Sequence, residues 1–205
     1  YDPTKKYKPN AKCHCGSGQK YKKCCRVLDQ LLGGTDGSQA LCDACNKGDM
    51  NAMNALLAAG VDVNCNDAGG TTPLMFACWN DHVKVIDALL ARKEIQINQA
   101  ANDGRTSLYM ACGNGHVKVI TALLSRKEIQ INQANSKGVT PLFIACQEDH
   151  VKVVNLLLAR KEIQINQAAN DGATSLFIAC QNDCVKVVNL LLARKEIQIN
   201  QAMND

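Results

Sequence analysis

Residues 168–197 read AANDGATSLFIACQNDCVKVVNLLLARKEI, and nearly the same string occurs repeatedly on their N-terminal side. The threonine that opens each unit recurs with a spacing of 34 residues, at Thr72, Thr106, Thr140 and Thr174. Self-similarity at such a period is typical of arrays in which small units stack on one another. A fifth, more divergent unit precedes these four. The stretch therefore predicts a stacked array of five units.

Each unit has the sequence features of two short helices. In the fourth unit Thr140 can accept hydrogen bonds from the free N–H groups of a helix start, and Pro141 occupies the first helical position, where its missing N–H costs nothing. A second helix follows, with an apolar stripe at Val151, Val154, Leu157 and Leu158. Arg160 and Lys161 are expected in its last turn, where cations complement the helix dipole. Neither helix can bury its stripe alone, so the predicted fold class is an all-α solenoid of stacked units.

The units resemble ankyrin repeats. The resemblance rests on Thr-Pro-Leu at 72–74 and 140–142, on Ala-Cys where that family has Ala-Ala, and on hairpin residues that recur in register. These hairpin residues are Asn98, Asn132, Asn166, Gly70, Gly104, Gly138 and Gly172. The resemblance covers residues 39–205, in units of about 39–71, 72–105, 106–139, 140–173 and 174–205. It implies a non-enzymatic protein that binds a protein partner on a concave surface, formed by the hairpin tips and the exposed ends of the first helices.

The units differ most at the positions of that surface, while the core positions hardly vary. Carried over position by position, the resemblance places partner binding at Trp79, Asn80, Asn102, Asp103, Arg105, Asn114, Lys137, Val139, Gln147, Glu148, Gln181 and Asn182. Trp79 is the only tryptophan, and Gly113 occupies the matching place in the next unit, which predicts a niche beside the indole for a partner side chain. Interfaces favour such aromatic anchors; the alternative is a tryptophan packed over its neighbour.

Four of the 12 cysteines lie within 13 residues of a polar, lysine-rich segment, at Cys13, Cys15, Cys24 and Cys25. Four thiols supply the ligands of one tetrahedral zinc site, and a segment this short cannot form a sufficient core without metal. A disulfide pair, redox catalysis by thiols of low pKa, and unligated thiols are the alternatives. An intracellular chain disfavours the disulfide, and the nearby lysines would stabilise a reactive thiolate and a zinc tetrathiolate alike. We therefore predict one bound Zn²⁺.

Residues 13–25, CHCGSGQKYKKCC, closely resemble the SEC-C motif, the zinc-binding element named from the C-terminus of the SecA preprotein translocase. His14 stands where that family commonly has proline. The element is similar to a small docking module, so the resemblance implies a second docking site. The N-terminal part is accordingly divided into a basic lead-in at 1–12, a SEC-C-like zinc finger at 13–32 and a linker at 33–38.

The basic character of the chain belongs to its N-terminal part. Residues 1–30 carry a formal charge of +6, whereas the whole chain carries +4, so residues 31–205 sum to −2. A ribosome- or nucleic-acid-associated role through residues 5–26 is therefore the alternative to a protein adaptor, although no aromatic stacking set accompanies the lysines. No apolar run reaches the roughly 18 residues of a membrane span, and no signal peptide is recognisable. We expect an intracellular protein, cytoplasmic or nuclear.

Histidines and cysteines of the array are expected to be structural. His82, His116 and His150 recur at one turn position, where helix capping and turn packing explain them, and Cys184 replaces the fourth. A series at small, buried helix positions comprises Cys45, Cys78, Cys112, Cys146 and Cys180. Cys42 and Cys45 have metal-like spacing, but Cys45 falls on the buried position.

The last unit keeps the apolar stripe of the internal units, at Val185, Val188, Leu191 and Leu192, with no polar replacement. The end of a solenoid normally carries a polar cap. We therefore expect the natural protein to continue into further repeats or the chain to self-associate through this end.

Overall fold

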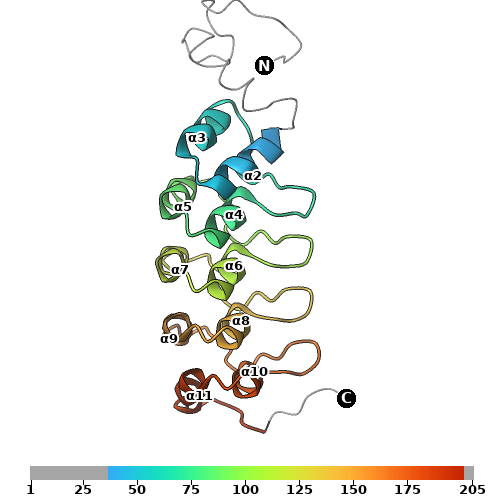
Figure 1. The fold of residues 1–205 in the computed structure, drawn as a ribbon, viewed down its shortest axis with the longest axis vertical. Coiled ribbons are helices and arrows are strands. Elements are labelled where there is room, and N and C mark those ends of the chain that lie inside the picture. Colours follow the sequence, from blue (N-terminus) through green and yellow to red (C-terminus); the bar gives the residue numbers. More distant parts are fainter. Residues whose placement is uncertain (1–36, 201–205) are drawn as a thin grey trace, which may run out of the picture.

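The computed structural model describes residues 37–200, which form five stacked units of two helices each (Figure 1). The first helices are α2 (Gly37–Lys47), α4 (Pro73–Trp79), α6 (Ser107–Gly113), α8 (Pro141–Gln147) and α10 (Ser175–Gln181). The second helices are α3 (Met50–Ala58), α5 (Val83–Leu90), α7 (Val117–Leu124), α9 (Val151–Leu158) and α11 (Val185–Leu192). Hairpin loops project from one side of the stack. The predicted helical solenoid is confirmed for this part of the chain.

The N-terminal predictions fall mostly outside the described residues. This applies to the basic lead-in, the zinc finger and most of the linker. α2 begins at Gly37, two residues before the predicted start of the array, so the last two residues assigned to the linker are helical.

Threonine caps start four of the first helices. The hydroxyl oxygens of Thr72, Thr106, Thr140 and Thr174 accept hydrogen bonds of 3.1 to 3.3 Å from the backbone N–H three residues later. These contacts satisfy donors that a helix start leaves free, and they confirm the predicted caps.

The predicted C-terminal ends of the second helices are wrong. α9 ends at Leu158, so Arg160 and Lys161 lie in a turn and not in the last helical turn. The Arg160 guanidinium instead donates to Glu162 Oε1 at 2.7 Å and, through Nη1, to the carbonyl oxygen of Leu124 in the preceding unit at 2.8 Å. Leu124 is the last residue of α7, so Arg160 ties two units together by binding the C-terminal carbonyl of the preceding helix.

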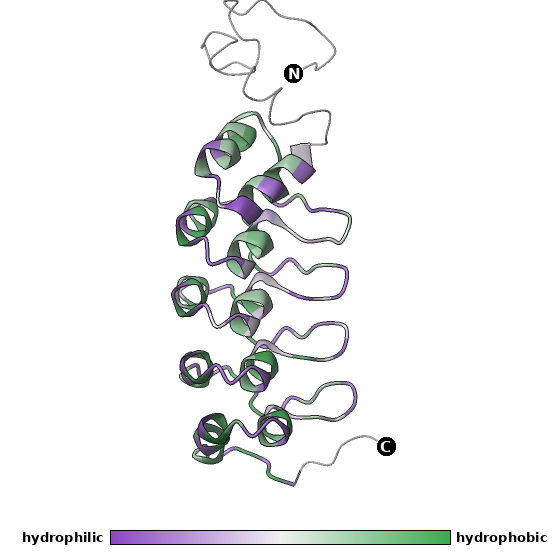
Figure 2. Cartoon of the chain, in the orientation of Figure 1, coloured by the Kyte–Doolittle hydropathy of each residue, from purple (hydrophilic) through white to green (hydrophobic). Residues whose placement is uncertain are grey.

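The core is a column of leucine, valine, isoleucine and small residues between the two helix layers, while polar residues dominate the hairpins (Figure 2). Cys78, Cys112 and Cys146 are fully buried as predicted, and burial raises the pKa of each thiol. Cys180 is exposed, contrary to the prediction, because no following unit packs on the last one within the described residues.

The turn histidines link neighbouring units and do not cap the start of the helix that follows them, so capping of that helix is the wrong interpretation. The Nε2 atoms of His82, His116 and His150 lie 2.9 to 3.0 Å from carbonyl oxygens of the preceding unit, whereas none of these side chains bonds its own helix start. In the last unit, where Cys184 takes this position, Asn182 Nδ2 donates to the Gln147 carbonyl at 3.0 Å.

Glycines in the hairpins allow close stacking of adjacent loops. Gly104 has φ +81°, and a Cβ placed on it would lie 2.7 Å from Ser136 N and 2.9 Å from Asn135 C. Gly60 has a similar φ of +90°, but nothing lies within 4 Å of its Cβ position. A substitution at Gly60 therefore introduces backbone strain alone, whereas a substitution at Gly104 introduces backbone strain and a steric clash with the next hairpin.

We expect Gly104→Ala to lower the free energy of unfolding by about 2 kcal/mol and Gly60→Ala by about 1 kcal/mol. Both changes place a Cβ in the left-handed region, but only the first also forces two hairpin backbones apart. Chemical denaturation followed by circular dichroism measures both. Equal losses in the two variants would show that the hairpins do not need this close approach.

The exposed large apolar side chains are unevenly distributed along the stack. Within residues 37–200 they are Trp79 in the second unit and Phe177, Val185, Leu192 and Ile199 in the last. The exposed side chains of α2 and α3 are mostly polar. None of the described helices is long and apolar enough to cross a membrane.

Candidate protein-binding groove

Trp79 stands between two hollows on the side of the first helices. The side chain is the last residue of α4, is 47% exposed and contacts both hollows. The first hollow has a volume of about 230 Å³ and the second about 320 Å³. Arg105 and Met110 also line both, so the two form one groove that the indole divides.

The sequence places the indole at this point by fixing both ends of α4. The Thr72 cap sets its start, and His116 from the next unit donates through Nε2 to the Trp79 carbonyl oxygen at 2.9 Å at its end. Gly113, the corresponding residue of α6, has no side chain to fill the space on the far side of the indole and lines the second hollow. A Cβ there would lie 3.2 Å from Ile144 Cγ1.

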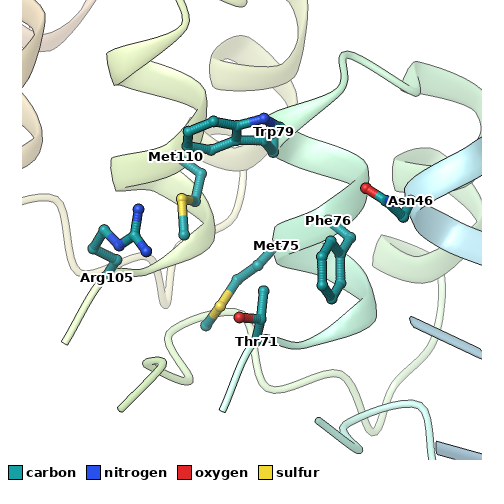
Figure 3. Close-up of a pocket in the computed structure, with 7 residues that line it drawn as sticks. All are labelled: Asn46, Thr71, Met75, Phe76, Trp79, Arg105 and Met110. Atoms are coloured by element: carbon teal, nitrogen blue, oxygen red, sulfur yellow. The ribbon is translucent and has the colours of Figure 1, made fainter. Parts of the chain in front are cut away.

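The first hollow is largely apolar. Met75 and Met110 are almost fully buried and form its floor, and Phe76 completes the lining beside the indole (Figure 3). Asn46 and Arg105 lie at opposite edges of this space. The hollow can accept one large apolar side chain, since thioether and aromatic groups offer adaptable apolar contact.

The second hollow is more polar. Tyr109, Ile144 and Glu148 line it with Asn114, whose Nδ2 donates to the Met110 carbonyl at 2.9 Å. The ordinary pKa of tyrosine lies well above neutral pH, and burial raises the pKa of Tyr109 further, so its hydroxyl is protonated and can donate a hydrogen bond. This hollow can therefore accept an apolar group that carries a polar end.

One ion pair borders the groove. Arg105 Nε donates to Asp103 Oδ2 at 2.6 Å, and the two side chains are 37% and 47% exposed. At such exposure an ion pair contributes little to stability. The pair is therefore available for exchange with charges on a partner.

The predicted surface residues divide into two groups. The second hollow brings together Trp79, Arg105, Asn114 and Glu148. The remaining residues line neither hollow: Asn80, Asn102, Asp103, Lys137, Val139, Gln147, Gln181 and Asn182. Three of these are used in stacking, since the amides of Asn80, Asn102 and Asn182 donate to the preceding unit at 2.9 to 3.1 Å.

The groove also contains residues that the sequence interpretation did not select. They are Asn46, Thr71, Met75, Phe76, Tyr109, Met110 and Ile144. A signal for two of them was present, because Met75 and Tyr109 stand where the ankyrin family has histidine. The other residues gave no such signal, because whether a side chain lines the groove depends on how neighbouring units stack.

The predicted zinc ligands Cys13, Cys15, Cys24 and Cys25 lie outside the described residues. Between residues 37 and 200, no group of three or more His, Cys, Asp or Glu side chains is arranged to hold a metal ion. Cys42 and Cys45 are buried with free thiols, and burial raises the pKa of Cys45 to about 12.

Comparison with known proteins agrees with the stacked geometry. A search of curated proteins finds no significant match to the chain. A family model described as ankyrin repeats in three copies matches four overlapping stretches, at residues 15–101, 41–135, 93–169 and 130–203. These matches cover most of the sequence and include every unit of the stack, so the chain belongs to the ankyrin-repeat family.

Proposed function

We propose that this chain is a non-enzymatic intracellular adaptor that binds a segment of a partner protein in the groove around Trp79. Ankyrin repeats are protein-interaction modules, and the groove supplies a specific place for the interaction. The observation that supports this proposal is the half-exposed indole between two hollows, above the buried side chains of Met75 and Met110 and beside the half-buried rings of Phe76 and Tyr109. Buried aromatic anchors in pockets contribute most of the binding energy at many interfaces.

The N-terminal cysteine segment serves as a second docking module in this proposal. Its four cysteines hold one Zn²⁺, and the resemblance to the SEC-C motif supports a docking role. If both modules engage one assembly, their linkage raises avidity through effective concentration without new contacts.

A second candidate function rests on the charge of +6 carried by residues 1–30. In that case the segment 5–26 docks on a ribosome or nucleic acid, and the repeats act as scaffold. Steep loss of binding between low and physiological salt would favour it, because phosphate contacts release counterions.

The groove can be tested with peptides in place of the natural partner. Peptides selected from a random display library on the immobilised chain should bind with a change in tryptophan emission, because the only tryptophan lies in the groove. Trp79→Ala should weaken their binding by about 2 kcal/mol, roughly thirtyfold, as expected for an interface anchor. Since that variant loses the fluorophore, calorimetry measures its affinity.

The matched control is Val185→Ala. Val185 is 65% exposed and lines neither hollow, so this variant should bind the selected peptides with unchanged affinity. Peptides that bind equally well to Trp79→Ala and to the unmodified chain would contradict the groove as the binding site.

A further inference from the structure

The layer of second helices carries a surface that differs chemically from the groove. Two rows of lysines run along it, with one lysine of each row in each of the last four units. The first row is Lys84, Lys118, Lys152 and Lys186, and the second row is Lys93, Lys127, Lys161 and Lys195. All eight side chains are exposed. We call the two rows together the lysine lattice.

The second helices hold these lysines on one side of the molecule. Lys84, Asp87 and Ala91 form the solvent-exposed stripe of α5 and of its last-turn cap, while Val85, Ile86, Leu89 and Leu90 are buried. The second helices stack in one column (Figure 1). Neighbouring lysines of a row are therefore about 8–10 Å apart, the usual distance between packed helices. The rows lie near opposite ends of each helix, on the order of 13 Å apart.

The lattice lysines have no counterions within the described part of the chain. Three of the four arginines in the same turns bind the glutamate two residues later, in the pairs Arg92–Glu94, Arg126–Glu128 and Arg160–Glu162. No ion pair of the described residues includes a lattice lysine. Glutamates of the turns therefore neutralise most of the arginines, whereas none of the eight lysines is in an ion pair within the described residues.

This arrangement separates charge across the solenoid. The segments 83–96, 117–130, 151–164 and 185–198 contain eight lysines and four arginines against four glutamates and one aspartate, a formal charge of +7. The rest of residues 37–200 contains three cations and ten carboxylates, a formal charge of −7. The modest charge of the whole chain therefore conceals a strongly cationic side.

Helix stability does not explain the first row. Each of its lysines is the second residue of an eight-residue helix, and none of these helices has an acidic residue in its first turn. A cation at this end opposes the helix dipole. The same unfavourable choice occurs in all four units, so a role outside the fold accounts for it better.

We propose that the lysine lattice binds an anionic lipid surface. Eight of the nine unpaired cations in these four segments are lysines, the exception being Arg194. Lysines act as compact point charges, whereas arginine is the usual residue for specific phosphate recognition. The exposed stripe between the rows carries no aromatic side chain, which removes the stacking contacts that single-stranded nucleic acid uses. The stripe residues are Asp87, Thr121, Asn155, Asn189, Ala91, Ser125, Ala159 and Ala193.

The shape of the lattice favours a lipid bilayer over a rod-like polyanion. Two rows on one layer of helices present charge in two dimensions, and clusters of four to eight basic residues are typical of peripheral binding to anionic lipid. The groove lies on the first helices and hairpins, so the protein can bind a lipid surface and a protein partner together.

The test uses the full chain and vesicles of phosphatidylcholine with and without phosphatidylserine. The chain should sediment only with the anionic vesicles, and physiological salt should weaken the binding. Changing all four lysines of the first row to glutamine should reduce the partition coefficient by roughly fivefold per lysine, on the order of several hundredfold in total. The same four positions changed to arginine should retain binding, because the charge is kept.

Two comparisons can overturn the proposal. Lys12, Lys20, Lys22 and Lys23 lie outside the described residues, and changing these four to glutamine should reduce vesicle binding less than changing the first row does. A larger loss in this N-terminal variant would place lipid binding in the N-terminal segment.

The second comparison uses duplex DNA. If the chain binds duplex DNA in preference to anionic vesicles at equal salt, nucleic acid and not lipid is the ligand of the lysine lattice. The glutamine variants should unfold at an unchanged or higher temperature, which excludes misfolding as the cause of lost binding.

Discussion

One zinc ion per chain, bound by Cys13, Cys15, Cys24 and Cys25, is the expected result of native mass spectrometry with metal analysis. The four thiolates match the ligand number of a structural zinc site. Because the segment has too few apolar residues for a core, metal binding should supply about 10–16 kcal/mol at neutral pH, the largest single contribution expected in the chain. Cys24→Ser should therefore abolish zinc binding.

The array provides the control for this experiment. Cys180→Ser removes an exposed thiol that lies outside the cluster, so it should leave zinc binding unchanged. Burial raises the pKa of Cys78, Cys112 and Cys146, which keeps these thiols unreactive toward thiol reagents. Removal of zinc by a chelator should consequently expose four additional reactive thiols. A metal-free chain whose four N-terminal thiols react at once would remove the zinc module from the proposed function.

The repeat pattern was sufficient to predict the fold because each local signal agrees with the stacked arrangement. Thr140 caps a helix and Leu157 is fully buried, and both follow from the period of one unit alone. The errors concern residues whose partners lie in another unit. Arg160 and His116 donate hydrogen bonds to carbonyl oxygens of the preceding unit. The sequence of a single repeat does not show how closely two units approach, so it does not predict these bonds.

The groove was predictable only at positions where one unit differs from the others. Trp79 and Gly113 stood out because they break the repeat, and the structure places both beside the second hollow. Met110 gave no signal, because a methionine in a short helix is equally compatible with the core. Asn102 was selected as a surface residue, but its amide bonds the Ala68 carbonyl of the preceding hairpin, so variation between units does not by itself indicate partner binding.

Leu158→Ala should lower the free energy of unfolding by about 3 kcal/mol, whereas Leu192→Ala should lower it by less than about 1 kcal/mol. Both leucines end the same octapeptide, VKVVNLLL, in α9 and α11, so helix propensity and local sequence are matched. They differ in exposure, which is 4% for Leu158 and 45% for Leu192. Urea denaturation at low protein concentration measures the difference, which comes from the cavity left in the packed interface between the fourth and fifth units.

The same pair of variants tests our further proposal that the chain self-associates through its last unit. Val185, Leu192 and Ile199 are exposed apolar side chains at that end of the described residues, and repeat proteins normally cover such an end with a polar unit. If a second copy covers it, the cost of Leu192→Ala should rise with protein concentration, because association stabilises the folded chain by mass action. The cost of Leu158→Ala should not change. A monomeric mass at all concentrations, together with a small and constant cost for Leu192→Ala, would contradict self-association through this unit.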